Sequence, residues 1–248
     1  MNKEELEGIL FMIETTGITN CGGRKQNEDA IRVKQNGNNI CLVVADGLGG
    51  HGGGQIASSI ATDTIIKCYE RNGLNSQQKV EEAFDEADDY VKDAQTNSCK
   101  MKTTMVMLCV EDKMAWWAHI GDSRLYHFHN GQLIHQTLDH SVSQMAVLMG
   151  EITKEEIRFH ADRSRILRAL GSDSCNPDIQ TPIFLEEGFH AFLLCTDGFW
   201  EYVNESEMQQ LLEVSSSSEK WLAEMELLLK RRVPENHDNY TAGAVFVL

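Results

Sequence analysis

The sequence has few of the features that mark linkers, membrane spans or disulfide frameworks. Among its 248 residues are only three prolines and no low-complexity run, so a long linker is not expected. No stretch approaches the roughly 20 apolar residues of a spanning helix, and the acidic N-terminus does not read as a signal peptide. The seven cysteines form no C-x-x-C pair. We therefore expect one cytoplasmic domain over residues 1–248, with buried free thiols.

Positive charge is also scarce. The chain has 22 Lys and Arg residues against 38 Asp and Glu residues, which gives a formal net charge of −16. Such a surface repels nucleic acid and anionic membranes, so we expect neither as a partner. The excess acid either keeps the protein soluble or is partly clustered to hold cations. Where the acidic residues lie in the fold decides between these interpretations.

Hydrophobic periodicity predicts strands and helices that do not alternate one by one. The middle of the chain reads as four consecutive strands in an antiparallel meander, at 102–112, 113–123, 124–131 and 132–138. The other predicted strands are 8–17, 29–34, 39–45, 189–198 and 240–248. The predicted helices are 55–71, 76–98, 141–149, 153–160, 205–214 and 217–232. This order predicts an α+β fold with antiparallel sheets rather than a βαβ fold.

A glycine-rich stretch, "VVADGLGGHGGG" at 43–54, raises the question of nucleotide binding. Gly47, Gly49 and Gly52 satisfy G-x-G-x-x-G between a predicted strand and a predicted helix. However, a second helix follows the first, and no strand ending in an acidic residue appears about 20 residues on. The G-K-[ST] of a P-loop is also missing. We interpret the match as a coincidence of glycine richness.

Acidic residues at strand ends are the more informative pattern. Asp46 ends a buried run beside the glycines, and the pattern recurs at other strand ends, with Asp197, Asp122, Asp238 and the pair Glu28 and Asp29. Brought together, these carboxylates would repel one another unless cations lay among them. Hard divalent ions with oxygen ligands, Mg²⁺ or Mn²⁺, fit best. Arg24, four residues before Glu28, could hold an anionic substrate at two points. This combination indicates hydrolysis of a phosphate ester.

The motifs, taken in order, resemble those of the metal-dependent serine/threonine protein phosphatases of type 2C, in their bacterial branch. They are "RKQNEDA" (24–30), "DGLGGHGGG" (46–54), "TTMV" (103–106), "IGDSRLY" (120–126), "LDHS" (138–141), "RALG" (168–171), "CTDGFWEYV" (195–203) and "ENHDNYTA" (235–242). Each is weak alone, but in register they cover almost the whole chain. The resemblance implies a four-layer α/β/β/α sandwich with two central antiparallel sheets flanked by helix pairs.

The resemblance also implies a site with two Mn²⁺ or Mg²⁺ ions and possible room for a third. Asp46 would bridge the two core ions, and the Gly47 carbonyl, Asp197 and Asp238 would complete the protein ligands. By the same resemblance, Glu28 and Asp29 would act through water, Arg24 would bind the phosphoryl group and Asp122 would bind a third ion. Glu201 stands where many members have a second acidic ligand for that ion. A bridging hydroxide would attack phosphorus in line, without a phosphoenzyme.

One departure concerns the general acid. Leu48 stands where eukaryotic members have a histidine, so no side chain is assigned this role, and a metal-bound water is the preferred hypothesis. His51 is a further candidate. Residues 139–175 correspond to the family's mobile flap, in which His140 is interpreted as structural. The flap's Asp162, Arg163, Arg165 and Arg168 are expected to pair with neighbouring charges rather than bind substrate.

The resemblance implies partners as well as chemistry. The substrates would be phosphorylated proteins, including a bacterial serine/threonine kinase and its targets, and we expect a monomer. The wording "TDGFWEYV", "DHSVSQM" and "RILRALG" looks closest to members found with type VI secretion systems. An alternative of another class is a pseudophosphatase that keeps the fold as a binding module. That alternative predicts loss of metal aspartates, yet Asp46, Asp197 and Asp238 are all present.

Overall fold

Two five-stranded antiparallel sheets face each other in the computed structural model, which describes residues 12–49, 52–173 and 175–248. The first sheet has the order β1-β12-β11-β8-β9, with β1 (Ile13–Asn20), β8 (Arg124–His129), β9 (Gln132–Gln136), β11 (His190–Cys195) and β12 (Tyr240–Val247). The second has the order β10-β7-β6-β3-β2, with β2 (Ala30–Asn36), β3 (Asn39–Ala45), β6 (Met105–Glu111), β7 (Met114–Ile120) and β10 (Asp178–Phe184). A two-residue pair, β4 (Gly47–Leu48) with β5 (Lys102–Thr103), lies beside them.

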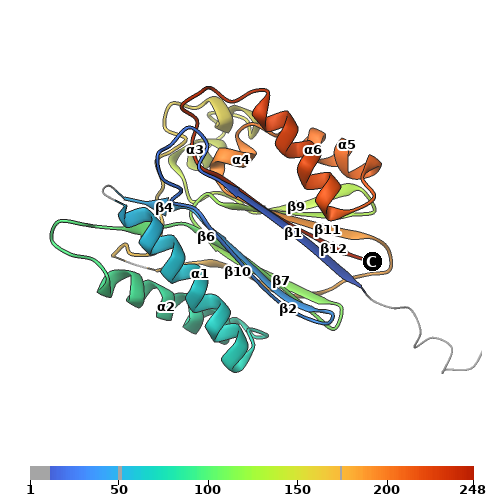
Figure 1. The fold of residues 1–248 in the computed structure, drawn as a ribbon, viewed down its shortest axis with the longest axis horizontal. Helices are drawn as coiled ribbons and strands as arrows, with labels where there is room; N and C mark the ends of the chain where they lie inside the picture. The colour runs from blue at the N-terminus through green and yellow to red at the C-terminus, as the bar shows by residue number, and fades with distance from the viewer. Residues whose placement is uncertain (1–11, 50–51, 174) are drawn as a thin grey trace, which may run out of the picture.

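Helix pairs cover the outer face of each sheet, as Figure 1 shows. The second sheet carries α1 (Gly53–Asn72) and α2 (Gln77–Asp93), and the first carries α5 (Glu205–Val214) and α6 (Ser218–Lys230), with the short α4 (Asp197–Trp200) beside them. This arrangement confirms the predicted four-layer α/β/β/α sandwich. No helix among the described residues is both long and apolar enough to cross a bilayer.

Strand β3 shows why the sandwich needs continuous apolar runs. Its residues Cys41 and Val43 pack against α1 and α2, while Leu42 and Val44 pack into the layer between the sheets. Because successive side chains of a strand point to opposite faces, a strand buried on both faces must be apolar at every position. Cys41, Cys109 and Cys195 are buried in such strands, as predicted from their apolar surroundings.

The predicted four-strand meander was wrong. Strands β6 and β7 form a hairpin in the second sheet, whereas β8 and β9 form a hairpin in the first. The chain crosses between the sheets at residues 121–123, where Gly121 has a φ of 101°. Sequence periodicity marks each strand but does not say which sheet it joins. The crossing carries Asp122 to the end of the sandwich.

Smaller differences concern element bounds. The helix predicted over 76–98 ends at Asp93, because polar residues replace the apolar spacing beyond it. The first strand extends to Asn20, and residues 8–11 of its predicted span lie outside the described residues. Strand β10 was not predicted, since it is a polar edge strand that contains Pro182.

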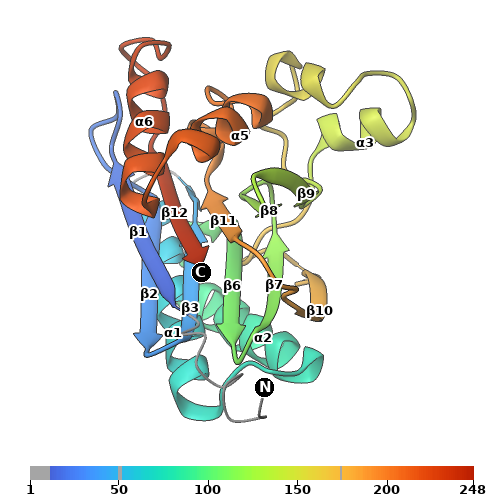
Figure 2. The same cartoon turned by 90° about the vertical axis from the view of Figure 1, so that its right-hand side faces the viewer.

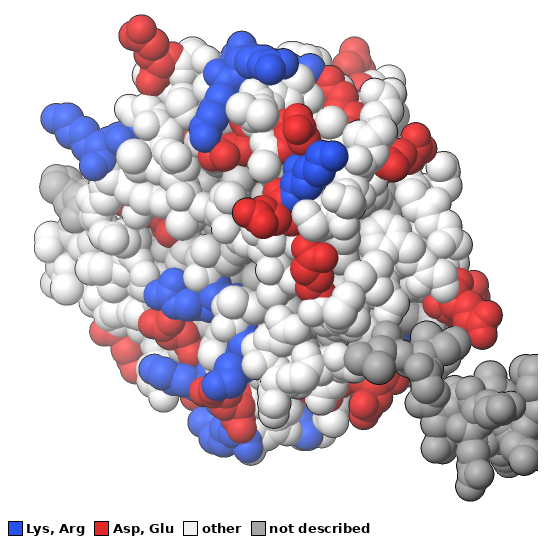
Figure 3. Space-filling model, turned by 45° about the vertical axis from the view of Figure 1, so that its right-hand side comes forward, with Lys and Arg blue, Asp and Glu red and all other residues white. Residues whose placement is uncertain are grey.

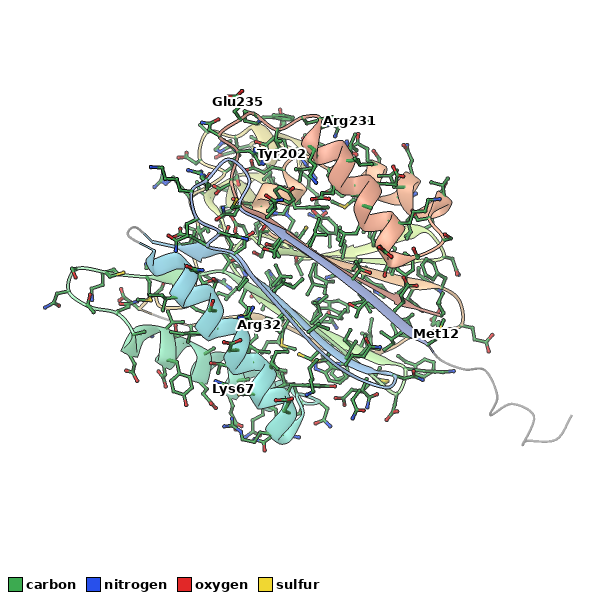
Figure 4. The ribbon with its side chains drawn as sticks, viewed as in Figure 1. Met12, Arg32, Lys67, Tyr202, Arg231 and Glu235 are labelled. Carbon is green, nitrogen blue, oxygen red and sulfur yellow. The ribbon has the colours of Figure 1, made fainter. Side chains whose placement is uncertain are left out.

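One end of the sandwich gathers the loops that matter for function. In Figure 1, β4 and α4 lie at this end, and Figure 4 places Tyr202 there and Met12, where β1 is about to begin, at the opposite end. Residues 139–175 add α3 (Val142–Leu148) and the 3₁₀ helix η2 (Glu155–Phe159). Figure 2 shows α3 at the margin of the molecule, away from both sheets. Backbone hydrogen bonds close the base of this segment, from Val142 to Arg165 and from Leu167 to His140.

Candidate metal centre

The acidic residues singled out from the sequence converge at this end of the sandwich. Asp46 directly follows β3, Asp197 is the first residue of α4 after β11, and Asp238 precedes β12 by two residues. Together with Glu28 and Asp122 they line one cavity of about 590 Å³. The other lining residues are Arg24, Lys25, Gln26, Gly47, Leu48, Gly49, Gly52, Ser164, Ile166 and Asn239. Asp29 is buried, does not line the cavity, and accepts a 2.9 Å hydrogen bond from Thr196 Oγ1.

Burial and mutual repulsion make four of these aspartates, Asp29, Asp46, Asp122 and Asp197, costly to ionise. Burial, and then the carboxylates of Asp29, Asp197, Asp122 and Asp238, raise the pKa of Asp46 well above its usual value. Burial is also the main reason why the pKa of Asp29 and that of Asp197 both rise to about 7. The pKa of Asp122 is raised by burial, with Asp197 and Asp139 adding to the effect. A bound cation would remove this cost by stabilising the charged forms.

Two buried carboxylate oxygens independently test whether the residues of the site suit a cation. Asp29 Oδ1 and Asp122 Oδ1 are buried and have no hydrogen-bond partner among the described residues. A buried oxygen without a partner is unfavourable, and native structures rarely keep one without an unseen water or ion. The donor set consists of carboxylate and carbonyl oxygens, which are the ligands of hard divalent ions such as Mg²⁺ and Mn²⁺. The residues present therefore fit the metals that the sequence predicts.

The glycines hold the Asp46 loop against the start of α1. A Cβ on Gly47 would lie 2.2 Å from the Gly54 carbonyl oxygen and 2.5 Å from that of Glu28, which leaves no room for a side chain. The Gly47 N–H donates to the Glu28 carbonyl oxygen at 3.2 Å. The glycines thus allow close packing of backbone beside Asp46. The antiparallel sheets agree with the rejection of a dinucleotide fold, which needs parallel strands.

Arg24 lies at the mouth of the cavity and contacts Asp238. Its Nε donates to Asp238 Oδ1 at 3.1 Å, and its Nη2 donates to Oδ2 at 2.8 Å. Both side chains are about half exposed, so this ion pair is weak and can exchange. The predicted phosphate-binding residue is therefore at the site. It is paired with a predicted metal ligand, which the sequence did not indicate.

Glu201 does not line the main cavity. It lies one turn beyond Asp197 and borders a neighbouring cavity of about 340 Å³. Its Oε1 accepts from Arg163 Nε at 2.8 Å, which ties the 139–175 segment to the end of α4. The other charged residues predicted to pair rather than bind substrate do so: Arg165 with Asp162, and Arg168 with Asp178. His51 lies outside the described residues.

Several polar residues that support the site were not singled out from the sequence. Thr104 Oγ1 accepts from the Asp46 N–H at 3.1 Å and pairs with Ser123 Oγ at 2.7 Å. Asn239 accepts from the Glu28 N–H at 2.8 Å and donates to the carbonyl oxygens of Cys21 and Gln26. Thr104 and Asn239 each lie within a motif quoted above, which was the available signal. Their partners depend on the fold.

The surface charge is mixed on the face of the molecule that includes the side opposite the site (Figure 1, Figure 3). On the face shown in Figure 3, Lys and Arg side chains lie next to Asp and Glu side chains. This sandwich, with carboxylates and one arginine around a single open cavity, defines a metal-dependent phosphoester hydrolase.

Comparisons with known proteins identify the family. The sequence pattern of protein phosphatase 2C matches residues 17–231. The "Serine/threonine phosphatase stp" of Listeria welshimeri is 31% identical over 207 residues, which cover 79% of this chain and 82% of that protein. The catalytic domain of the serine/threonine protein phosphatase PstP, solved in complex with two manganese ions, superposes with a TM-score of 0.79 at 26% identity, covering 96% of this chain and 99% of that one.

A further solved structure shares the fold at lower identity. PppA, described as a key regulatory component of the type VI secretion system in Pseudomonas aeruginosa, has a TM-score of 0.77 at 24% identity and covers 96% of this chain and 98% of its own. The chain belongs to the protein phosphatase 2C family. It is a metal-dependent serine/threonine protein phosphatase, as its sequence predicted.

Proposed function

We propose that the phosphatase holds two Mn²⁺ or Mg²⁺ ions in the carboxylate cavity and acts on phosphorylated proteins there. Asp46, the Gly47 carbonyl oxygen, Asp197 and Asp238 would hold the two ions directly, since all four residues line the cavity. Glu28 and Asp29 act through water. Asp122 binds a third ion. The observation that carries the proposal is the convergence of these carboxylates, two of them with orphaned buried oxygens, on one cavity.

Each part of the chain then has a defined task. When bound, the divalent ions supply a water of lowered pKa and neutralise charge on the phosphate. Arg24 exchanges its contact with Asp238 for the phosphoryl oxygens and orients the group for in-line attack. Thr104 and Asn239 fix the backbone at Asp46 and Glu28, so the ligands are positioned before substrate arrives. The contact with Arg163 favours a role for Glu201 in holding the flap over one as a metal ligand.

The wider role is proposed from the family and from relatives. The substrates are proteins phosphorylated on serine or threonine, and a bacterial serine/threonine kinase and its targets are the expected partners. The fold likeness to PppA supports a link to type VI secretion. We propose a cytoplasmic monomer that binds neither nucleic acid nor membranes. Residues 1–248 would form one phosphatase domain, with 139–175 as its flap.

The test is metal-dependent hydrolysis by a matched pair of proteins. Wild type and Asp46→Asn are stripped with EDTA, and Mn²⁺ or Mg²⁺ is added back with p-nitrophenyl phosphate or a phosphothreonine peptide. Asn has nearly the shape of Asp but lacks its charge, so we expect metal-stimulated activity in the wild type to fall by about 10²-fold or more in the variant. Folded wild type without metal-stimulated activity would instead support the binding-module alternative.

A further inference from the structure

The imidazole of His140 contacts the backbone of the turn that carries Asp122. The backbone N–H of Gly121 donates to the ring Nδ1 of His140 at 3.1 Å. The backbone N–H of His140 in turn donates to the Gly121 carbonyl oxygen at 2.8 Å. Gly121 is therefore held on both its donor and its acceptor by one residue. His140 comes from the base of the 139–175 segment, whereas Gly121 follows β7.

The turn at Gly121 has a backbone conformation that favours glycine. Its φ is 101°, and a Cβ there would lie 2.6 Å from Thr104 Cβ. The next residue is Asp122, whose carbonyl oxygen accepts from Trp200 Nε1 at 3.0 Å. Its side chain is 2% exposed and has an oxygen without a partner among the described residues. The backbone contacts thus decide where this carboxylate points.

The far side of the imidazole is also fixed. Because Gly121 donates to Nδ1, the proton of the neutral ring is on Nε2, which lies 3.3 Å from Asp178 Oδ2. Arg168 binds the other oxygen of Asp178 at 3.0 Å. The ring of His119 stacks on that of His140 with centroids 4.7 Å apart. A carboxylate that orients an imidazole in this way selects its tautomer.

His119, His140 and Asp178 could be taken for a metal site of their own, since their ligand atoms lie within 4.8 Å of one another. However, Arg168 Nη1 lies 3.3 Å from His140 Nε2 and 3.0 Å from Asp178 Oδ1, so a cation already faces these two groups. His119 Nε2 is bonded to the Leu138 carbonyl oxygen at 2.8 Å. These contacts already use the nitrogen and oxygen atoms that a metal ion would need from the three residues.

We propose that His140 is a positioning residue for Asp122: the chain Asp178, His140 and the Gly121 amide holds the turn so that the Asp122 carboxylate faces the metal cavity. The inference rests on the proposed function, in which Asp122 is a metal ligand. It assigns to His140 and Asp178 a specific hydrogen-bonding role rather than a general one in packing.

Two substitutions of His140 by side chains of similar size separate a hydrogen-bonding role from a packing role. In His140→Asn the amide oxygen lies near the position of Nδ1 and can still accept from Gly121, whereas the longer Gln side chain of His140→Gln places its amide near the position of Nε2. Mn²⁺ binding is measured by calorimetry on EDTA-stripped protein, with Asp122→Asn as reference. Hydrogen exchange of the Gly121 amide gives a readout that needs no metal.

We expect His140→Gln to weaken the weakest Mn²⁺ site about 10- to 100-fold, as Asp122→Asn does, and to speed Gly121 exchange. His140→Asn should stay close to wild type in both. In the double variant His140→Gln/Asp122→Asn the two losses should not add. If Gln does not fold, Asp178→Ala, at an exposed position, should shift both readouts in the same direction.

Other outcomes identify which claim fails. If Asp122→Asn lowers Mn²⁺ affinity while neither His140→Gln nor Asp178→Ala does, the positioning role is wrong and the proposed metal site stands. Equal losses of Mn²⁺ affinity in His140→Asn and His140→Gln would also overturn the positioning role, because they would show that the ring acts through packing. Wild-type Mn²⁺ binding by Asp122→Asn would remove the proposed ligand role of Asp122, and the inference with it.

Discussion

Arg24 and Asp238 form a two-point ion pair at the mouth of the metal cavity, with contacts of 3.1 and 2.8 Å. The two side chains have different proposed roles in the site: Arg24 would bind phosphate and Asp238 would bind a metal ion. Their side chains are 55% and 51% exposed, so the pair contributes at most about 1 kcal/mol. The guanidinium therefore lies beside a proposed metal ligand and has no strong bond to break when substrate arrives.

Substitution of Arg24 should therefore affect substrate more than metal. We expect Arg24→Ala to lower kcat/KM for p-nitrophenyl phosphate by about 10²-fold, because a charged donor to the phosphoryl oxygens is lost. The Mn²⁺ dissociation constant should change by no more than about fivefold, which corresponds to 1 kcal/mol. Arg24→Lys keeps the charge but not the two-point geometry, so its activity should be intermediate. An equal loss of metal affinity and activity in Arg24→Ala would contradict the assignment.

The contact between Arg163 and Glu201 allows the flap and metal roles of Glu201 to be separated. If Glu201 holds the flap, Glu201→Gln and Arg163→Gln remove the same ion pair. Both variants should then show faster limited proteolysis within residues 149–167 and near-equal changes in KM for a phosphopeptide. Mn²⁺ affinity should stay within about fivefold of wild type in both. A loss of Mn²⁺ affinity in Glu201→Gln alone, as large as that in Asp122→Asn, would make Glu201 a ligand.

The ends of buried strands were the part of this site that the sequence could predict. Asp46 and Asp197 follow strands that are mostly apolar and almost completely buried, and such runs have few structural alternatives. Because such strands end together at one edge of a sandwich, carboxylates at their ends were expected to meet. The antiparallel class and the helix pairs followed from the same order of elements.

The sequence could not predict relationships set by the third dimension. Strands β7 and β8 are separated by only three residues, yet the positive φ of Gly121 sends them into different sheets. Strand β10 has half-exposed and polar positions and a proline, so no period marks it, and the role of Asp178 beside His140 was hidden with it. Arg24 and Asp238 are separated by 214 positions, a pairing that no local pattern encodes.

A group of buried histidines at the interior of the first sheet predicts sensitivity to acid. His127 is 1% exposed, contacts His190 Nδ1 at 3.0 Å and stacks on Phe192. Burial, with His190, His135 and His129 adding to the effect, lowers the pKa of His127 to about 3. Below pH 6.5 the unfolded chain takes up a proton that the folded chain does not. The contribution of His127 to the stability of the fold therefore falls from pH 6.5 toward pH 3. At pH 5 it is about 2 kcal/mol lower than at neutral pH.

The measurement is the difference in unfolding free energy between wild type and His127→Gln, at pH 7 and pH 5 in EDTA. The difference is needed because Asp29 and Asp197, whose pKa values are raised to about 7, give metal-free protein the opposite slope: they favour the folded state as pH falls. That slope is common to both proteins and cancels. We expect the advantage of wild type to shrink by about 2 kcal/mol at pH 5. A difference in unfolding free energy between the two proteins that does not depend on pH would rule out His127 as the source of the acid sensitivity.

Arg124 is a buried residue two positions after Asp122, and its substitution tests how much its contacts contribute to the stability of the fold. Its side chain is 2% exposed, and its Nε and Nη2 both lie 2.7 Å from the Asp139 carboxylate. Its guanidinium carbon lies 3.4 Å from the ring centre of Trp200, the residue that donates to the Asp122 carbonyl oxygen. Arg124 and Trp200 therefore support the turn at Asp122, which His140 also contacts through Gly121.

We expect Arg124→Leu to destabilise the fold by about 3–5 kcal/mol, because it leaves the Asp139 carboxylate buried and unpaired. Asp139→Asn in the same chain removes that charge, so the double variant should lose less than the sum of the single losses, by up to about 3 kcal/mol. Urea unfolding of the wild type, both single variants and the double variant gives the four free energies. Strict additivity would show that the two side chains act independently, and the stacking of Arg124 on Trp200 would then be its main contribution. Because that stacking fixes the Trp200 contact to Asp122, Arg124→Leu should also weaken Mn²⁺ binding under conditions where it remains folded.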